Sequence, residues 1–363
     1  MVKHMPIESS AADDSLFFRK SSFFKFYLII FIFLVHAVNY EAYGLADTPG
    51  WAAAVLYRIQ IWIIYLCGMS LPMYFFLSGY SFMLGYTPDK TLDKWKRRVY
   101  SLFIPWLLWN TIMWVFGYAV ESIPQIAGHL NSGFGFELSL RSWLVDGLWR
   151  HADGPMWFIG NLMVCALAAP LFYPLVKGKY TGLICITAGA VLLSLNNTGR
   201  YSPFMSLLFY AEGAYCAIHL RHVASRTYSR PLRLCAWLVL AAYLLFCCKD
   251  SVLNGGALHI IVYTITCVAV WVAVGDAELG PRAAKAEKYR FWIYASHYLP
   301  LECVEKLWLI AGGVSVGTAW VGIIISPVVT VALLVVCGML VEKHCYPLWC
   351  MLTGKKPRLR KTN

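Results

Sequence analysis

The sequence predicts an all-α integral membrane protein, a bundle of about ten transmembrane helices. Of its 363 residues, 59% are hydrophobic and only 14% are charged, which is more apolar than ordinary globular domains. The apolar residues come in repeated runs of roughly 17–25, each long enough to cross a hydrocarbon core as a helix. The formal net charge is +12. The basic residues of the chain form short clusters between apolar runs instead of one stripe, so we expect no nucleic-acid partner.

Polar residues between the apolar runs set the expected helix boundaries. We expect a single membrane domain over residues 1–363, without an internal repeat. Most cysteines fall inside apolar runs and no two form a CxxC pair, so we expect buried thiols and no metal site. The predicted helices are 24–44, 59–86, 101–120, 156–176, 181–196, 203–220, 233–248, 257–275, 290–311 and 317–340.

The distribution of basic residues predicts the orientation. They gather in alternate gaps between the helices, namely 87–100, 177–180, 221–233, 276–290 and 341–363. The positive-inside rule therefore predicts that both termini are cytoplasmic. On the opposite side, the loop 121–155 is the longest. Its stretch 138–149 is periodic and should lie as an amphipathic helix on the outer surface, with Trp143 and Trp149 at the headgroups.

His36 is the sharpest functional candidate, because an ionisable side chain at membrane depth is costly unless it is paired or solvated. It lies eleven residues beyond Lys25, roughly 16 Å along a helix. Asn39, Tyr40 and Tyr43 follow at offsets that place them on the helical face of His36. Such a histidine can take a proton from a hydroxyl that attacks a thioester. The alternative is a histidine that bonds a carbonyl and serves helix packing.

Other polar residues inside apolar runs have a structural alternative as well. His297 is as well suited to a structural hydrogen bond as to a role in a site, and Glu302 and Glu305 can be satisfied by Lys306. For the pair Glu212 and His219, seven residues apart, we favour the structural interpretation.

A basic cluster precedes the helix expected at 101–120. Lys96, Arg97 and Arg98 are typical of positive-inside anchoring. They are also suited to grip the phosphates of a bulky anionic donor such as coenzyme A. Charge alone does not separate these two interpretations.

Several segments, taken together, resemble the membrane acyltransferase 3 family, whose members O-acylate sugars and envelope glycans. The family has an arginine, ten residues and a histidine in its first helix, and Lys25 and His36 occupy those places. The lysine is a departure, because it keeps the charge but loses the bidentate fork. Without a fused extracytoplasmic domain, the chain resembles the compact, stand-alone type. The other similar segments are Tyr74–Tyr80, Lys96–Arg98 with Ile104–Trp106, Gly154–Leu162, Phe291–His297 and Pro347–Gly354.

The resemblance implies an acyl-CoA-dependent O-acyltransferase of a bacterial-type cytoplasmic membrane. The donor, acetyl-CoA or succinyl-CoA with acetyl as the first expectation, would enter from the cytoplasm, and the hydroxyl of a glycan would approach from outside. No cofactor is expected to be permanently bound. A secondary transporter or a lipid or glycan flippase is the alternative, since it would also place polar residues at mid-membrane. The implied roles are general base for His36, donor binding for Lys25, Lys96, Arg97 and Arg98, and acceptor binding for Asn39, Tyr40, Trp157 and His297.

Overall fold

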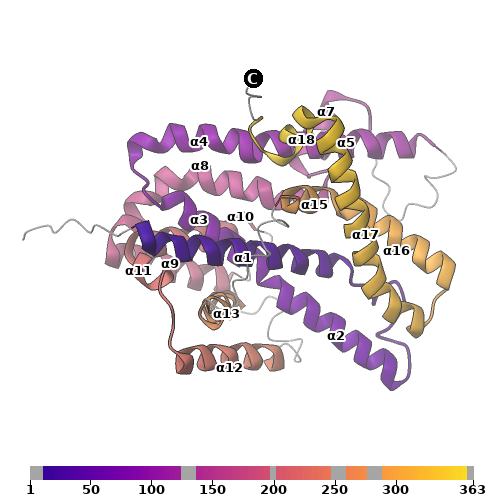
Figure 1. Ribbon diagram of the computed structural model, residues 1–363, viewed down its shortest axis with the longest axis horizontal. Helices are drawn as coiled ribbons and strands as arrows, with labels where there is room; N and C mark the ends of the chain where they lie inside the picture. Colours follow the sequence, from indigo (N-terminus) through magenta and orange to yellow (C-terminus); the bar gives the residue numbers. More distant parts are fainter. Residues whose placement is uncertain (1–10, 124–135, 197–201, 247–258, 276–287, 358–363) are drawn as a thin grey trace, which may run out of the picture. The chain divides into compact units, whose positions relative to one another are not determined.

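The computed structural model describes residues 11–123, 136–196, 202–246, 259–275 and 288–357, and the regular elements within them are all helical (Figure 1). This confirms the predicted all-α class. Short 3-10 and π segments join several of the helices. The α-helices are α1 (Ala11–His36), α2 (Trp51–Gly68), α3 (Ser70–Met83), α4 (Thr91–Arg98), α5 (Ile104–Glu121), α7 (Leu140–Ser142), α8 (Trp157–Lys177), α9 (Lys179–Leu195), α10 (Pro203–His219), α11 (Arg221–Ala224), α12 (Arg230–Phe246), α13 (His259–Ala273), α15 (Arg290–Ser296), α16 (Tyr298–Gly312), α17 (Val316–His344) and α18 (Tyr346–Thr353).

Helices fall on each of the ten apolar segments expected from the sequence. The ends of two of them, 247–248 and 257–258, lie outside the described residues. Four helical stretches support a membrane protein, while ten spans and cytoplasmic termini stay predictions. These stretches, long and apolar enough to cross a membrane, are Trp51–Met83, Pro88–Glu121, Gly154–Lys177 and Val316–His344.

The first helix differs from the expected 24–44 at both ends. α1 begins earlier and ends at His36, and the chain then continues in turns. The side-chain oxygen of Gln60 accepts hydrogen bonds from the backbone N–H groups of Asn39 and Tyr40, both at 2.8 Å. In a continued helix these groups would bond to carbonyls one turn earlier. The prediction that the polar residues after His36 share its helical face is therefore wrong.

Prolines divide two segments that the sequence predicts as single helices. α2 and α3 meet at Met69, because Pro72 has no N–H to bond the carbonyl one turn before it. For the same reason Pro300 interrupts the expected helix 290–311 at His297, between α15 and α16. The interruption leaves the histidine between two helices instead of inside one.

The expected amphipathic stretch 138–149 is helical, as α7 followed by the π segment Trp143–Trp149. Two indoles hold it against α5. The N–H of Trp143 donates to the hydroxyl of Thr111, and the N–H of Trp114 donates to that of Ser142, both at 3.1 Å. Part of the surrounding loop, 124–135, lies outside the described residues.

The chain packs as two compact units. Because each unit draws on three separate stretches, neither is a contiguous sequence domain, and the single domain expected over 1–363 stays a prediction. Unit 1 comprises Met1–Phe31, Tyr65–Gly85 and Leu171–Glu287, and unit 2 comprises Ile32–Ile64, Tyr86–Pro170 and Lys288–Asn363.

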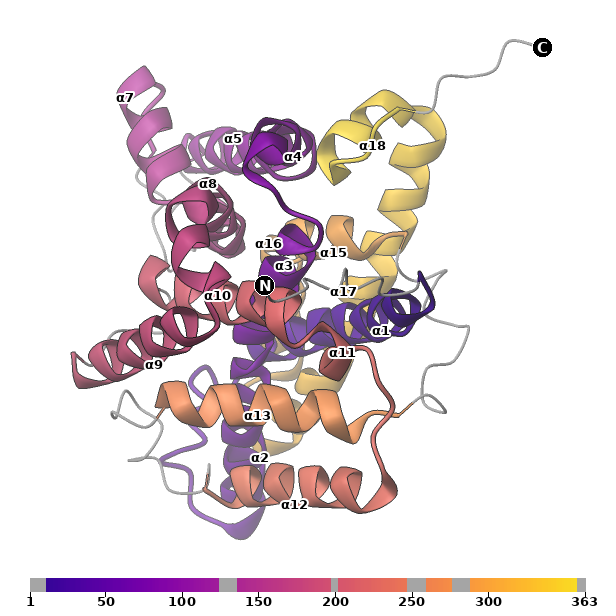
Figure 2. The same ribbon diagram turned by 90° about the vertical axis from the view of Figure 1, so that its left-hand side faces the viewer.

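Unit 1 contains a close crossing of α3 and α10. A Cβ atom at Gly79 would collide with the carbonyl oxygen of Tyr210, and one at Gly213 would collide with the carbonyl oxygen of Phe76. The two backbones therefore touch, which only glycine permits at these positions. In both ribbon views α12 lies beside α13 (Figures 1 and 2), and the packed positions are the buried alanines Ala236, Ala269 and Ala273.

Unit 2 contains α5, α16, α17 and α18. The indole N–H of Trp109 on α5 donates to the carbonyl of Leu352 on α18, at 3.0 Å. Gly354 ends α18 with a φ of 67°, and a Cβ atom there would lie 2.8 Å from the carbonyl oxygen of Ser101. α16 and α17 pack side by side and are joined through Gly313, whose φ is also 67°. These contacts hold together the helices of unit 2, the unit that also contains the end of α1.

Candidate functional site

His36 is the last residue of α1 and lies in unit 2, where it is half-buried. Its ring centroid is 5.2 Å from that of His297 and 5.5 Å from that of Tyr298. Neither of its ring nitrogens forms a hydrogen bond with the part of the chain that the structure describes. Both nitrogens are therefore available to a substrate or to a neighbouring side chain.

His297 is brought to His36 from the opposite end of the sequence and is 1% exposed. Its Nδ1 lies 2.6 Å from the carbonyl oxygen of Tyr294, one turn earlier. Its Nε2 is buried and has no hydrogen-bond partner among the described residues. The ring of Phe33, at a centroid distance of 5.0 Å, packs on it. The sequence thus named two histidines that unit 2 brings into contact.

Acidic residues lie around Tyr298, the residue that edges onto the His36 ring. Its electrostatic partners are Glu302, Asp153 and Glu305. One carboxylate oxygen of Glu305 is buried without a partner in the described chain, and so is the hydroxyl of Tyr43. The structural alternative for Glu302 and Glu305, an ion pair with Lys306, is absent from the ion pairs of the described residues. These oxygens are free to accept hydrogen bonds from a hydroxyl-rich ligand.

Asp153 is a site residue that the sequence analysis missed. It is 1% exposed, and one of its carboxylate oxygens has no partner in the described residues. Its backbone N–H donates to the side-chain oxygen of Asn110, at 3.2 Å. Burial raises the pKa of its carboxyl to about 8. The group therefore holds a proton at neutral pH.

Asn39 and Tyr40 lie just beyond α1 and already have partners. The Asn39 amide accepts a bond from Gln60 at 2.8 Å and donates to the carbonyl of Ala319 at 3.3 Å. The hydroxyl of Tyr40 donates to the carboxylate of Glu41, at 3.0 Å. The observed role of Asn39 is to fasten the chain after His36, and acceptor binding by either residue stays a prediction.

Trp157, the other residue predicted to bind the acceptor, is half-buried at the start of α8. Its ring lies against Phe158 at a centroid distance of 6.3 Å, and Phe158 lies 6.1 Å from Tyr294. The hydroxyl of Tyr294 in turn donates to the carbonyl of Pro155, at 2.5 Å. One connected set of contacts therefore links the start of α8 to the carbonyl that holds His297.

The basic residues predicted to bind the donor are divided between the units. Lys25 is half-buried in unit 1, where the hydroxyl of Tyr74 donates to its carbonyl at 2.6 Å. The last turn of α4 in unit 2 carries Lys96, Arg97 and Arg98. Lys96 and Arg97 are exposed and Arg98 is half-buried. The exposed side chains have the freedom to bind phosphate groups.

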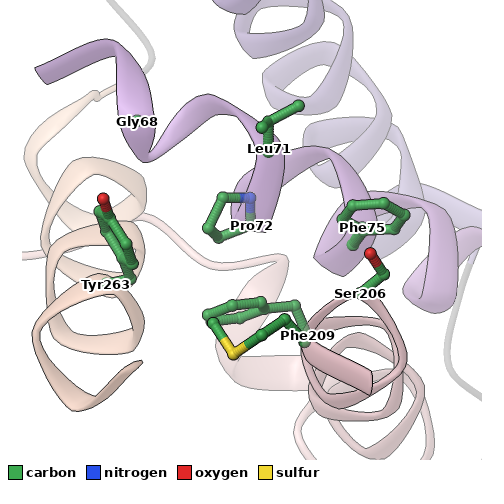
Figure 3. A pocket seen from close by; sticks show the side chains of 8 residues that line it. Gly68, Leu71, Pro72, Phe75, Ser206, Phe209 and Tyr263 are labelled. Carbon is green, nitrogen blue, oxygen red and sulfur yellow. The ribbon is translucent and has the colours of Figure 1, made fainter. Parts of the chain in front are cut away.

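A pocket in unit 1 has a different character (Figure 3). Figure 3 shows Pro72 and Phe75 of α3 opposite Phe209 of α10, with Tyr263 of α13 at one side. Its lining offers the hydroxyls of Ser206 and Tyr263 but no carboxylate, imidazole or amine. The pocket therefore lacks a histidine or carboxylate that could act as a general base, and the candidate site for the chemistry is the one around His36.

Two further polar residues singled out in the sequence also lie in unit 1. Glu212 accepts a hydrogen bond from the hydroxyl of Thr264, at 3.1 Å. The Nε2 atom of His219 lies 2.9 Å from the carbonyl oxygen of Val176. Both contacts join α10 to a neighbouring segment, in keeping with the structural interpretation.

Comparison with known proteins identifies a family and a relative. The model of the acyltransferase 3 family, described as an acyltransferase domain, matches residues 22–342. The succinoglycan biosynthesis protein ExoH of Rhizobium meliloti (strain 1021) is 24% identical over 320 residues, which cover 83% of this chain and 84% of the relative. No solved structure matches the chain.

Proposed function

The chain belongs to the acyltransferase 3 family, and on this premise we propose that it is a membrane-embedded O-acyltransferase with His36 as general base. It moves an acyl group, acetyl in the first instance, from acyl-CoA to a hydroxyl of a cell-envelope polysaccharide. The ExoH relative, named for succinoglycan biosynthesis, supports a polysaccharide as the acceptor.

The observation that carries the proposal is the state of the His36 ring. It is half-buried, it contacts a second histidine, and its nitrogens are not used by the described residues. A histidine kept only for packing would bond a carbonyl, as His219 does with Val176. An imidazole without such a bond can take a proton from a substrate hydroxyl within hydrogen-bond reach.

The reaction then runs in one transfer. His36 removes the proton of the acceptor hydroxyl as that oxygen attacks the thioester carbonyl of acyl-CoA. The tetrahedral intermediate collapses by breaking the carbon–sulfur bond, and the CoA sulfur takes the proton from the imidazolium. An ester and free CoA are the products, and the imidazole is restored. No acyl-enzyme is required.

The acidic residues near Tyr298 suit a sugar acceptor. The unpartnered oxygens of Glu305 and Tyr43 can accept hydrogen bonds from sugar hydroxyls. Trp157 offers an aromatic face on which a sugar ring can stack, and Tyr40 lies close to His36 in sequence. We assign acceptor binding to this group of residues in unit 2.

The donor approaches from the cytoplasmic side of a bacterial-type inner membrane in this proposal, with both termini on that side. The clustering of basic residues in alternate loops supports the orientation. Lys96, Arg97 and Arg98 bind the phosphates of acyl-CoA. Lys25 lies in the other unit, and its role in donor binding stays a prediction; as a lysine it carries a charge without the bidentate fork of an arginine.

A transfer assay with the full chain in lipid nanodiscs tests the function. The protein is given acetyl-CoA or succinyl-CoA and a polysaccharide whose O-acyl groups have been removed with alkali. Free CoA is measured with a thiol reagent, and new esters on the glycan are measured by NMR. We expect CoA release that depends on the acceptor. The rate should fall about 10²–10⁴-fold in His36→Gln, because a positioned base contributes this much.

The matched control is His222→Gln, a histidine that is exposed on α11. It should leave the rate unchanged. Full activity in a folded His36→Gln protein would contradict the role of His36. Absence of acyl-CoA binding to the intact protein would contradict the proposal as a whole and would favour the transporter or flippase.

A further inference from the structure

The tautomer of His297 follows from one contact. Its Nδ1 lies 2.6 Å from the carbonyl oxygen of Tyr294, and a carbonyl oxygen can only accept a hydrogen bond. Nδ1 must therefore carry the proton. In the neutral imidazole the lone pair is then on Nε2. Tyr294 is itself held by its hydroxyl, which donates to the carbonyl of Pro155, so the direction of the lone pair is fixed.

This lone pair is buried and lacks a donor among the described residues. A buried acceptor without a donor is unfavourable, because it has lost its hydrogen bonds to water, so a donor is expected within reach. Among the described residues, three rings lie close to His297. The ring of Phe33 at 5.0 Å has no donor, and the hydroxyl of Tyr294 is already used. The third ring, His36 at 5.2 Å, has an N–H without a partner in the described chain.

We propose that His297 is a positioning residue, which accepts a hydrogen bond at Nε2 from one ring nitrogen of His36. A neutral imidazole has a single N–H, so this bond leaves the lone pair on the other nitrogen of His36. That nitrogen then faces the acceptor hydroxyl. The carbonyl of Tyr294 thus keeps the proton of His297 on Nδ1. Nε2 of His297 in turn keeps the proton of His36 on the ring nitrogen that donates to it. The inference rests on the proposed role of His36 and reassigns His297 from acceptor binding to positioning.

Two substitutions of His297 separate this role from a structural one. An asparagine amide reproduces the position of Nδ1, so His297→Asn keeps a donor for the carbonyl of Tyr294 but has no group at Nε2. A glutamine amide reaches the position of Nε2, so His297→Gln offers an acceptor oxygen to His36. The structural bond and the positioning bond are thus removed one at a time. Thermal unfolding of each variant establishes that it is folded.

The readout is the tautomer of His36, measured by ¹⁵N NMR of histidine-labelled protein in nanodiscs without substrates. Comparison with His36→Gln assigns the signal. We expect a single neutral tautomer in the wild type and in His297→Gln, and a mixture of both tautomers in His297→Asn. In the transfer assay, kcat should fall about 10²-fold or more in His297→Asn, with the KM for acyl-CoA unchanged, and His297→Gln should recover most of the loss.

An unchanged His36 tautomer in folded His297→Asn would overturn the inference, even if activity were lost. Equal loss of activity in both variants would overturn it as well, because only one of them lacks the acceptor. The NMR experiment needs no turnover. If the wild-type protein transferred no acyl group, the proposed function would fail while the tautomer measurement would still decide the relationship between the two histidines.

Discussion

Gly79 and Gly213 lie at one crossing of α3 and α10, and each places its Cα against a backbone carbonyl of the other helix. Side chains can move aside for an added methyl group, but a helix backbone in this position cannot. The crossing also gives a physical reason for the Ser-Gly step in the phrase Tyr74–Tyr80, which the sequence offered only as a resemblance.

We predict that Gly79→Ala and Gly213→Ala each lower the free energy of unfolding by about 3 kcal/mol or more, because overpacking here must separate two helices. Thermal unfolding in detergent measures the effect. Gly189→Ala on α9 is the control, since its Cβ would meet only Leu208 at an ordinary 3.5 Å. This variant should be neutral or slightly more stable, because alanine favours the helix by about 1 kcal/mol. Equal stability of all three variants would contradict the close crossing.

Gln60→Leu should destabilise the protein by about 2–4 kcal/mol, because it leaves the buried N–H of Asn39 and the partly buried N–H of Tyr40 without an acceptor. The end of α1 would shift with them, so the initial rate of acyl transfer should fall by a larger factor than the fraction of folded protein. Unfolding and initial rates are measured on the same preparation. Val55→Ala, at an exposed position on the same helix, should change neither quantity. A fully active Gln60→Leu protein would show that the end of α1 needs no such support.

Asp153 makes stability depend on pH. Its pKa in the folded protein is about 8, above the ordinary 3.8, so the folded state binds this proton more tightly than the unfolded state. The contribution is complete below about pH 4, declines as pH rises and is lost above about pH 8, at up to about 1.4 kcal/mol per pH unit. Asp153→Asn mimics the protonated carboxyl and should flatten this decline between pH 5 and 8.

Melting temperatures across this pH range test the prediction for Asp153. Asp146→Asn is the control, because that carboxylate is paired with Arg150 near the surface and should leave the pH profile as in the wild type. If Asp153→Asn declined with pH as steeply as the wild type, the decline would come from other groups.

Arg97→Gln and Lys96→Gln should raise the KM for acyl-CoA while kcat stays nearly constant, because they remove binding that is equal in ground state and transition state. An exposed charge pair contributes up to about 1 kcal/mol, so we expect an increase of roughly fivefold for each charge. The increase should be larger at low ionic strength. Lys90→Gln, an exposed cation just before α4, is the control. A fall in kcat at constant KM would assign these residues to something other than donor binding.

Helix positions were largely predictable, because an apolar run in a membrane has to satisfy its backbone internally. The helix ends were not predictable where a side chain distant in sequence determines them. The residues directly after His36 do not predict a turn. The turn depends on Gln60, whose amide oxygen accepts hydrogen bonds from two backbone N–H groups. The break at His297 was foreseeable, since Pro300 follows it at the spacing that removes one helical hydrogen bond.

The candidate site was half predictable. His36 and His297 stood out because each is an ionisable residue in an apolar run, but only the fold brings residues 261 positions apart to a centroid distance of 5.2 Å. Asp153 was missed because it follows a polar loop, in which a carboxylate is unremarkable in sequence. Its burial arises from packing against Asn110 on α5, and no local pattern reports such a contact.

The early end of α1 also has an electrostatic consequence for its last residue. Aligned peptide dipoles give the carboxyl end of a helix a partial negative charge, which stabilises a cation there by roughly 0.3–2 kcal/mol. His36 occupies that position, so the field of α1 favours the imidazolium that forms when the proton leaves the hydroxyl. In a helix that continued to residue 44, the same histidine would sit within the dipole array and would gain little from it. The turn held by Gln60 ends α1 at His36, and the dipole of α1 thereby increases the basicity of that histidine.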